Sequence, residues 1–369
     1  MDQLESEIIR KITANRSNRG NSVIMKKLCD TVHASFTLNS VAYDKEALCL
    51  LAQSFLNSAE EYKKQFGRFV LEWFDANDFI TLTTSGTTGK PKEIHLKKEA
   101  MVNSAFATAE FFNLEEGCKA LHCLPTQYIA GKMMLVRAIV CGWQLDLVKP
   151  DAHPLDGNDA AYDFAAMVPL QVENSIAELY RVKKTIIGGA KLNPMLAGKL
   201  KTLPVSVYET YGMTETITHI AAKKVQEQAF SVLPGITIGT DERNCLVIEA
   251  PRVSDEKIVT NDVVEIVNSN QFKWLGRYDN VINSGGVKLF PEKIEEKLSG
   301  KIPYRFFVIG KPDARLGEKL LLVIEAEPYD IQTLVFDVLD KFEKPKEILF
   351  VPKFRETETG KIKRLETIQ

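Results

Sequence analysis

A glycine- and hydroxyl-rich loop constrains this chain more than any other feature. Residues 83–92 read Thr-Thr-Ser-Gly-Thr-Thr-Gly-Lys-Pro-Lys and follow the apolar residues 79–82, which predict a strand. Glycine lets backbone N–H groups approach an anion closely, hydroxyl groups donate further hydrogen bonds, and lysine supplies positive charge. The loop is not a Walker A sequence, because its glycines stand too close together and proline follows its first lysine. The composition predicts a phosphate-binding loop, and the alternative is a solvated turn.

Length and charge narrow the class of protein. The chain has 369 residues, 47 basic and 49 acidic, with a net charge of −2, so no global field attracts nucleic acid or an anionic membrane. The 6 cysteines form no Cys-x-x-Cys pair, which indicates reduced thiols and no structural zinc. The N-terminus lacks a signal-peptide core, and no segment approaches about 18 consecutive apolar residues. We expect a cytoplasmic protein without membrane insertion.

Strand-like and helix-like segments alternate after this loop. Strands are predicted at residues 94–96, 120–124, 141–148 and 183–187, and helices at 98–112 and 132–140. An amphipathic helix is predicted earlier, from around Leu48 to an end at Lys63 and Lys64, which leads to Phe66. The alternation indicates an α/β fold with a largely parallel, helix-covered sheet, which binds ligands at the carboxyl ends of its strands.

A second polar cluster follows the predicted strand at residues 204–209. Tyr211 can stack on a base, Thr214 can donate a hydrogen bond to a phosphate, and Glu215 can bind Mg²⁺. The alternative is the capped start of a helix. A glycine turn, Gly188-Gly189-Ala190, follows another predicted strand.

These motifs resemble those of the acyl-adenylating superfamily, which includes acyl- and aryl-CoA ligases, firefly-luciferase-like enzymes and nonribosomal adenylation domains. Residues 83–92 resemble its T-S-G-T-T-G-x-P-K loop, and residues 211–215 its Y-G-x-T-E motif. Residues 276–295 resemble its G-R-x-D-x-x-I-x-x-G-G motif with the P-x-E-I-E helix start that follows, and the segment ending in Gly360-Lys361 resembles P-x-x-x-x-G-K. The four signatures occur in the family's order.

The resemblance implies a two-step ligase that uses Mg·ATP and CoA. ATP-binding roles are implied for Thr83, Thr84, Ser85, Gly86, Thr87, Thr88, Gly89, Lys90, Lys92, Gly188, Gly189, Ala190, Tyr211, Gly212, Asp262 and Arg277. Catalytic roles are implied for Lys361, Thr214 and Glu215, with Glu215 as the Mg²⁺ ligand, and Gly285 and Gly286 are implied to bind CoA. Asn261 stands where the family has a glycine, directly before the ribose-binding Asp262.

The same resemblance implies two domains. Residues 1–278 form a large ATP- and acyl-binding domain with a shortened N-terminal region, and residues 279–369 form a small mobile α+β domain after the hinge Asp279. In this tail, strands are predicted at residues 306–309, 320–324 and 348–351, with a helix near 331–342. Pro291 and Glu292 predict another helix start.

Three residues concern the acid substrate. Tyr128 stands where the family has a pocket-lining histidine, Gly131 follows at the family's glycine position, and Arg137 lies further along the predicted helix. In o-succinylbenzoate:CoA ligases of menaquinone biosynthesis, an arginine at this spacing pairs with the second carboxylate of the substrate. The short chain and residues 212–221 also resemble that group. The alternative for Arg137 is a surface arginine on a helix.

We therefore expect an ATP-dependent acid:CoA ligase, with o-succinylbenzoate as the acid and with ATP and CoA as its other partners. Another aryl- or acyl-CoA ligase, or a stand-alone adenylation enzyme that loads a carrier protein, are the alternatives. A catalytically silent nucleotide-binding protein is a third alternative, but the retention of both Glu215 and Lys361 argues against it.

Overall fold

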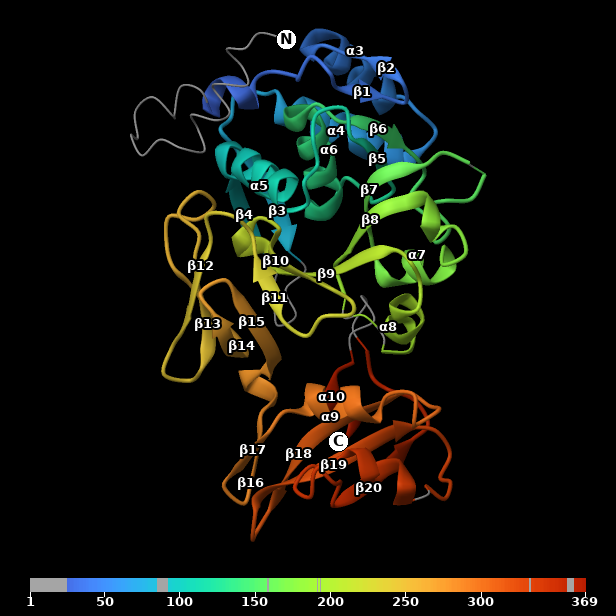
Figure 1. Ribbon diagram of the computed structural model, residues 1–369, viewed down its shortest axis with the longest axis vertical. Coiled ribbons are helices and arrows are strands. Elements are labelled where there is room, and N and C mark those ends of the chain that lie inside the picture. Colours follow the sequence, from blue (N-terminus) through green and yellow to red (C-terminus); the bar gives the residue numbers. More distant parts are fainter. Residues whose placement is uncertain are drawn as a thin grey trace.

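The computed structural model describes residues 25–84, 92–157, 159–190, 192, 194–331, 333–356 and 362–369. Figure 1 shows a large body of helices and strands above a smaller C-terminal sheet, joined by the chain that follows β15. The numbering of helices and strands follows Figure 1 and begins at α3 and β1.

The sequence pattern predicts some of the helices of the large body. They are α3 (Lys45–Leu56), α4 (Glu61–Trp73), α5 (Lys98–Phe111), α6 (Ile129–Cys141), α7 (Pro169–Asn174) and α8 (Pro194–Lys201). α3 begins where the Asp44 carboxylate accepts a hydrogen bond from the Ala47 N–H, 2.8 Å away. α6 ends at Gly142, whose φ of 70° suits glycine. The helices predicted at residues 98–112 and 132–140 are confirmed. The helix predicted from around Leu48 to Lys63 and Lys64 is wrong in its extent, because residues 57–60 interrupt it between α3 and α4.

One large sheet runs through this body. Its 13 strands stand in the order β12-β13-β14-β15-β11-β10-β9-β8-β7-β5-β6-β1-β2. They are β1 (Thr37–Leu38), β2 (Val41–Ala42), β5 (Lys119–His122), β6 (Gln144–Leu147), β7 (Tyr162–Met167), β8 (Val182–Ile187), β9 (Ser206–Gly212), β10 (His219–Lys224), β11 (Phe230–Val232), β12 (Thr237–Thr240), β13 (Cys245–Glu249), β14 (Ile258–Asn268) and β15 (Gln271–Arg277). β3 (Phe79–Thr84) and β4 (Lys92–Lys97) form a separate hairpin.

The strands from β9 to β1 pair in parallel, and the remaining pairs of the large sheet are antiparallel. The predicted α/β class is therefore confirmed, but the expectation of a largely parallel sheet is wrong, because the strands from β10 to β15 follow one another without crossover helices and pair in antiparallel register. The parallel part of the sheet, with α6 and α7 in its connections, brings the carboxyl ends of β5, β7, β8 and β9 to one edge.

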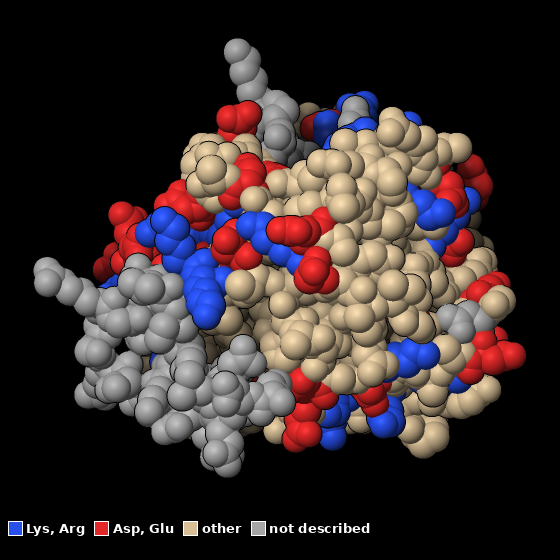
Figure 2. Space-filling model, turned by 90° about the horizontal axis from the view of Figure 1, so that it is seen from above, with Lys and Arg blue, Asp and Glu red and all other residues tan. Residues whose placement is uncertain are grey.

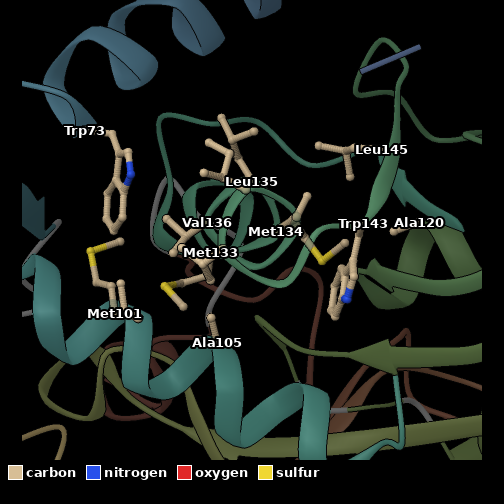
Figure 3. Packing of buried hydrophobic residues seen from close by; sticks show 14 of the residues in the cluster. Trp73, Met101, Ala105, Ala120, Met133, Met134, Leu135, Val136, Trp143 and Leu145 are labelled. Carbon is tan, nitrogen blue, oxygen red and sulfur yellow. The ribbon is translucent and has the colours of Figure 1, made fainter. Parts of the chain in front are cut away.

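The core of the large body forms around α6. Every residue of this helix from Gly131 to Val140 is buried. In Figure 3, Trp73 and Met101 lie on one side of α6, and Met134 lies toward Trp143 on the other. All four side chains are at most 1% exposed, so α6 is enclosed by α4, α5 and the sheet.

The C-terminal sheet has its own apolar cluster, which includes Ile294, Val308 and Leu322. Its elements are β16 (Ile282–Ser284), β17 (Val287–Leu289), α9 (Pro291–Leu298), β18 (Phe306–Asp313), β19 (Gly317–Glu325), η4 (Thr333–Val338), β20 (Glu347–Val351) and α10 (Arg364–Thr367). The three strands predicted in the tail are confirmed, and Pro291 starts α9 as predicted.

The α-helix predicted at residues 331–342 is wrong. Over the described residues, this segment forms only the short 3₁₀ helix η4, Thr333–Val338. Val335 and Val338 are β-branched, which restricts their side chains in an α-helix. The 3₁₀ turn still packs Val335 and Phe336 against the apolar cluster of the C-terminal sheet.

Charged side chains are mixed over the surface. Figure 2 shows lysine, arginine and acidic side chains interspersed around a broad uncharged area on the face seen from above. No single-sign field covers the described part of this face, in line with the net charge of −2.

Candidate active site

The glycine-rich loop joins the two strands of the β3–β4 hairpin. The strands pair in antiparallel register from Phe79 with Lys97 to Thr84 with Lys92. The loop therefore begins and ends at the paired residues Thr84 and Lys92. The predicted strand before the loop is confirmed. Ser85, Gly86, Thr87, Thr88, Gly89 and Lys90 lie outside the described residues, as does Lys361, and of Thr83, Thr84 and Lys92 only the backbone is described.

The second glycine motif lies at the carboxyl end of β8, beside β9. Gly189 has a φ of +81°, which favours glycine. A β-carbon on Gly188 would lie 3.1 Å from the Thr210 hydroxyl, which itself donates a hydrogen bond to the Ile187 carbonyl at 2.9 Å. The Gly188–Ala190 turn therefore lies next to the strand that carries Tyr211.

Tyr211, Asp262 and Trp274 form a hydrogen-bonded group between β9, β14 and β15. The Tyr211 hydroxyl donates to Asp262 Oδ2 at 2.7 Å, and Trp274 Nε1 donates to Asp262 Oδ1 at 3.0 Å. Arg277, which pairs with Asp262 in the strand register, lies 3.8 Å from the same Oδ1. Both oxygens of this buried carboxylate are thus engaged.

The surroundings of Tyr211 keep its phenol protonated. Burial, followed by the charge of Asp262, raises the pKa of Tyr211 well above its ordinary value. Its ring packs edge-on against Phe272, with the centroids 5.2 Å apart. The phenol therefore stays protonated and acts as a donor. Asp262 lies inside β14, where it pairs with Arg277 of β15.

Thr214 and Glu215 occupy a single 3₁₀ turn after β9. The turn is held by Thr216, whose hydroxyl accepts from the Met213 N–H at 2.9 Å, and β10 follows directly. The alternative of a capped α-helix start is therefore wrong. The next residue, Ile217, has a φ of +64°, a strained conformation for a β-branched side chain. Such strain is often stored at functional sites.

Glu215 is exposed, and a single carboxylate fits a shared metal site. Mg²⁺ is usually bound by one or two carboxylates together with substrate phosphates. Within the described ranges, no group of three His, Cys, Asp or Glu side chains could hold a metal ion alone. The residues present thus fit an ion held between Glu215 and a phosphate.

Arg137 lies in the interior of the large body. It is 1% exposed, so the alternative of a surface arginine is wrong. Its Nη1 contacts the Met134 sulfur at 3.7 Å, whereas Nε and Nη2 have no hydrogen-bond partner. Among the described residues, no carboxylate pairs with it, and burial lowers the pKa of Arg137 to about 10. A buried guanidinium without a partner is costly to a fold.

Two buried histidines lie in the same interior. The pKa of His219 is well below its ordinary value, first because of burial and then because of the charge of Arg137. Its Nε2 lies 3.4 Å from the Thr108 hydroxyl. His122, at the end of β5, has both ring nitrogens unpartnered, and burial lowers its pKa to about 4. Both rings are neutral near pH 7 and supply no anion to Arg137.

Tyr128 and Gly131 stand at the start of α6. Tyr128 is its N-cap residue and is 61% exposed, so in this structure it does not close a pocket. A β-carbon on Gly131 would lie 2.3 Å from the Pro125 carbonyl oxygen. Gly131 is therefore required by the close packing of α6 on the preceding loop, whatever its role toward a substrate.

Sequence reasoning missed the ion pair that joins these parts. Lys132 Nζ donates to Glu72 Oε2 at 2.9 Å, and Glu72 Oε1 accepts from the Thr81 N–H at 3.1 Å. The pair links α6 and α4 to the strand that carries the glycine-rich loop. A lysine inside an otherwise apolar helix was the available signal.

The segment between the two sheets contains Arg277 and Asp279. Arg277 ends β15, Asp279 lies in the 3₁₀ turn η3 (Tyr278–Asn280), and their side chains pair at 3.2 Å. Gly285 and Gly286 form the β16–β17 turn, with φ angles of 59° and 83°. The Gly285 N–H donates to the Leu316 carbonyl at 2.8 Å.

Comparison with known proteins shows the family. The family described as AMP-binding enzyme matches residues 20–242, more than half of the chain. A crystal structure of an acyl-CoA synthetase (AMP-forming)/AMP-acid ligase II-like protein from Dyadobacter fermentans is 38% identical with a TM-score of 0.59, over 87% of this chain and 97% of that one. The chain belongs to the AMP-binding enzyme family.

Other similar proteins are longer than this chain. The 2-succinylbenzoate–CoA ligase of Enterococcus faecalis is 25% identical over 357 residues, covering 84% of this chain and 74% of the relative. That of Salmonella typhimurium is 25% identical over 329 residues, covering 83% and 71%. The O-succinylbenzoate coenzyme A synthetase of Bacillus subtilis, solved with ATP and magnesium, shares the fold at a TM-score of 0.67 and 18% identity, over 78% of this chain and 69% of that one.

No helix in the described part of the chain is long and apolar enough to span a membrane.

Proposed function

We propose that this protein is an AMP-forming acid:CoA ligase that acts through an acyl-adenylate, with o-succinylbenzoate as its acid. Membership of the AMP-binding enzyme family supports the nucleotide chemistry. The curated relatives named 2-succinylbenzoate–CoA ligase support the choice of acid. Menaquinone biosynthesis is the pathway in which such a ligase works.

The buried guanidinium of Arg137 carries the substrate proposal. Its Nε and Nη2 lack partners although the side chain is 1% exposed. A carboxylate would accept both hydrogen bonds in a fork and neutralise the charge. o-Succinylbenzoate has two carboxylates, so one remains to pair with Arg137 when the other reacts. A monocarboxylic acid would leave Arg137 unpaired.

The roles of the nucleotide-binding residues follow from their positions. The 83–92 loop and Thr214 bind the phosphates, Gly188, Gly189, Ala190 and Gly212 give the adenine and acyl groups close approach to bare backbone, and Tyr211, Asp262 and Arg277 hold the nucleoside. Glu215 and a phosphate hold Mg²⁺, which when bound screens the phosphate charge. Lys361 stabilises the charge that builds as the carboxylate attacks the α-phosphate.

Two domains divide the reaction into its two steps. We place the boundary at residues 278/279, because the large sheet ends with β15 at Arg277 and the next sheet begins with β16 at Ile282. Rotation about Asp279 exchanges Lys361 for Gly285 and Gly286 at the active site. Thioester formation with CoA then follows adenylation.

Pyrophosphate release tests this function. The purified chain is incubated with Mg·ATP and a panel of mono- and dicarboxylic acids, with and without CoA. We expect release with o-succinylbenzoate and a soluble acyl-CoA product when CoA is present. A better rate with benzoate or a fatty acid would reject the substrate. Adenylation without transfer to CoA would favour the carrier-protein alternative.

A further inference from the structure

We propose that Arg243 is a positioning residue that locks the segment between the two domains in the orientation seen here, and so sets the balance between the two half-reactions. Arg243 follows the β12 strand, in the turn that leads to β13. The inference rests on the proposed function and on the hinge at Asp279. Its evidence is a chain of side-chain contacts that reaches the hinge.

The Arg243 guanidinium donates hydrogen bonds to several partners. Nε donates to Asp241 Oδ2 at 2.8 Å, and Nη2 lies 2.7 Å from the same oxygen. Nη2 also donates to the Thr260 carbonyl at 3.2 Å, and Nη1 donates to Asn261 Oδ1 at 3.0 Å. Asp241 fixes the guanidinium, which in turn fixes the amide of Asn261, because an amide whose oxygen is held presents its NH₂ in one direction.

The oriented amide of Asn261 reaches the hinge. Asn261 Nδ2 donates to Asp279 Oδ2 at 3.3 Å and to Oδ1 at 3.5 Å. The Arg243 guanidinium also stacks over the ring of Tyr278, with Cζ 5.2 Å from the centroid. Consecutive residues of the connecting segment are thus tied to the β12–β13 turn and to β14. We call Arg243, Asn261, Tyr278 and Asp279 the hinge latch.

The latch depends on a residue type in which this chain departs from the resembled motif. Asn261 stands where the T-G-D pattern has a glycine, and glycine has no side chain that could reach Asp279. Arg243 alone does not contact Asp279, which is reached only through the Asn261 amide. The latch is therefore a property of this sequence rather than of the motif.

The latched orientation is the one that suits adenylation. In Figure 1, α10 lies on the side of the C-terminal sheet that faces the large body, whereas the β16–β17 hairpin lies on its lower flank. Rotation about Asp279 would pull its carboxylate from Asn261 and Tyr278 from the guanidinium. The latch stabilises the first half-reaction and must open for the second.

Separate assays of the two half-reactions test the latch. Arg243→Ala and Asn261→Ala are compared with wild type in pyrophosphate release from acid and ATP, and in thioester formation from supplied acyl-adenylate and CoA. We expect each variant to lower the ratio of the first rate to the second by about tenfold, because a hydrogen bond to a charged group is lost. The double variant should lose no more than either single one, since both act through one contact.

Lys257→Ala is the matched control. Lys257, directly before β14, pairs with Glu249 at the end of β13 that lies away from Asp279. Its removal should leave the ratio unchanged. Equal loss of both half-reactions in Arg243→Ala would show damage to the turn, and an unchanged ratio would show that the contacts have no effect; either result overturns the latch. Arg243→Lys, which keeps the charge beside Asp241 but loses the fork, should behave like Arg243→Ala.

Limited proteolysis tests the latch without any substrate. Trypsin cleavage after Arg277, whose side chain is 47% exposed, should be several-fold faster in Arg243→Ala and Asn261→Ala than in wild type or Lys257→Ala. Unchanged cleavage would overturn the latch. An inactive wild type with faster cleavage in the variants would reject the proposed ligase while the latch stands.

Discussion

The residues proposed to bind the nucleotide, here called the nucleotide side, and those proposed to bind the acid, the acyl side, differ in whether their buried polar groups have partners. On the nucleotide side, Asp262 accepts hydrogen bonds from Tyr211 and Trp274 and has Arg277 nearby. On the acyl side, Arg137 is equally buried but leaves two nitrogens without partners. The first arrangement is complete without a ligand, and we propose that a ligand completes the second. A buried charged group without a hydrogen-bond partner is therefore more informative about a substrate than one whose hydrogen bonds are all made.

The two arrangements also differ in their effect on the stability of the fold. A satisfied buried carboxylate stabilises the fold through its partners, whereas an unpaired buried charge costs stability until an anion arrives. On the proposed function, the nucleotide side positions the nucleotide and the acyl side selects the acid. The following tests alter one side and leave the other intact.

The largest effect is expected at Lys361, on the nucleotide side. Lys361→Ala should lower pyrophosphate release from acid and ATP by about 10²- to 10³-fold, the usual loss when one group that stabilises transition-state charge is removed. It should convert supplied acyl-adenylate and CoA to thioester at nearly the wild-type rate, because that step uses the other domain orientation. Equal loss of both steps would reject the domain rotation.

Acid should destabilise the acyl side through His122. The pKa of this histidine is about 4 in the fold and 6.5 ordinarily, so the unfolded chain binds the proton first as the pH falls. Its contribution to stability is complete above pH 6.5 and declines by up to about 3 kcal/mol toward pH 4. Urea unfolding at several pH values measures it. His122→Phe should remove this part of the pH dependence, and the same slope in the variant would contradict the assignment.

Stability should change in opposite directions on the two sides. Asp262→Ala leaves Tyr211 and Trp274 without their acceptor and should lower the free energy of unfolding by about 2 kcal/mol. Arg137→Leu removes an unpaired charge, so it should be neutral or raise that free energy by about 1 kcal/mol. Urea titration of the ligand-free proteins compares them. A destabilised Arg137→Leu would mean that Arg137 has an internal structural role.

A smaller effect is expected at Glu215. Glu215→Gln should lower the adenylation rate by about tenfold at low Mg²⁺, because a neutral amide is a poorer ligand for a hard cation. Excess Mg²⁺ should restore part of the rate, as seen in a titration of pyrophosphate release. A defect independent of Mg²⁺ concentration would contradict the metal role and leave Glu215 as a residue of the turn.

Local patterns predicted much of the fold. The strand before the glycine-rich loop, α5, α6 and the tail strands all follow from periodicity and turn residues. The contact between Tyr211 and Asp262 does not, since the two residues are 51 positions apart and meet only through the order of the large sheet. The prediction of an α-helix at residues 331–342 was wrong, because the backbone there forms only a short 3₁₀ helix.

The burial of Arg137 could have been predicted from the composition of its helix. Residues 129–141 are apolar on every face except at Lys132 and Arg137, and a helix that is apolar all round is buried. Its arginine is then buried too. No sequence pattern predicts that Lys132 pairs with Glu72, or that Arg137 has no partner among the described side chains.

The pairing of Arg137 with a second carboxylate is tested most directly by comparing o-succinylbenzoate with its two monoacid analogues, 3-benzoylpropionate and 2-butanoylbenzoate. We predict that wild type prefers the diacid by about 10²-fold in kcat/KM over the analogue that keeps the reacting carboxylate, through KM, with the KM for ATP unchanged. Arg137→Leu should reduce that preference to within a few-fold. A wild type that uses a monoacid equally well, or a variant that keeps the full preference, would contradict the account.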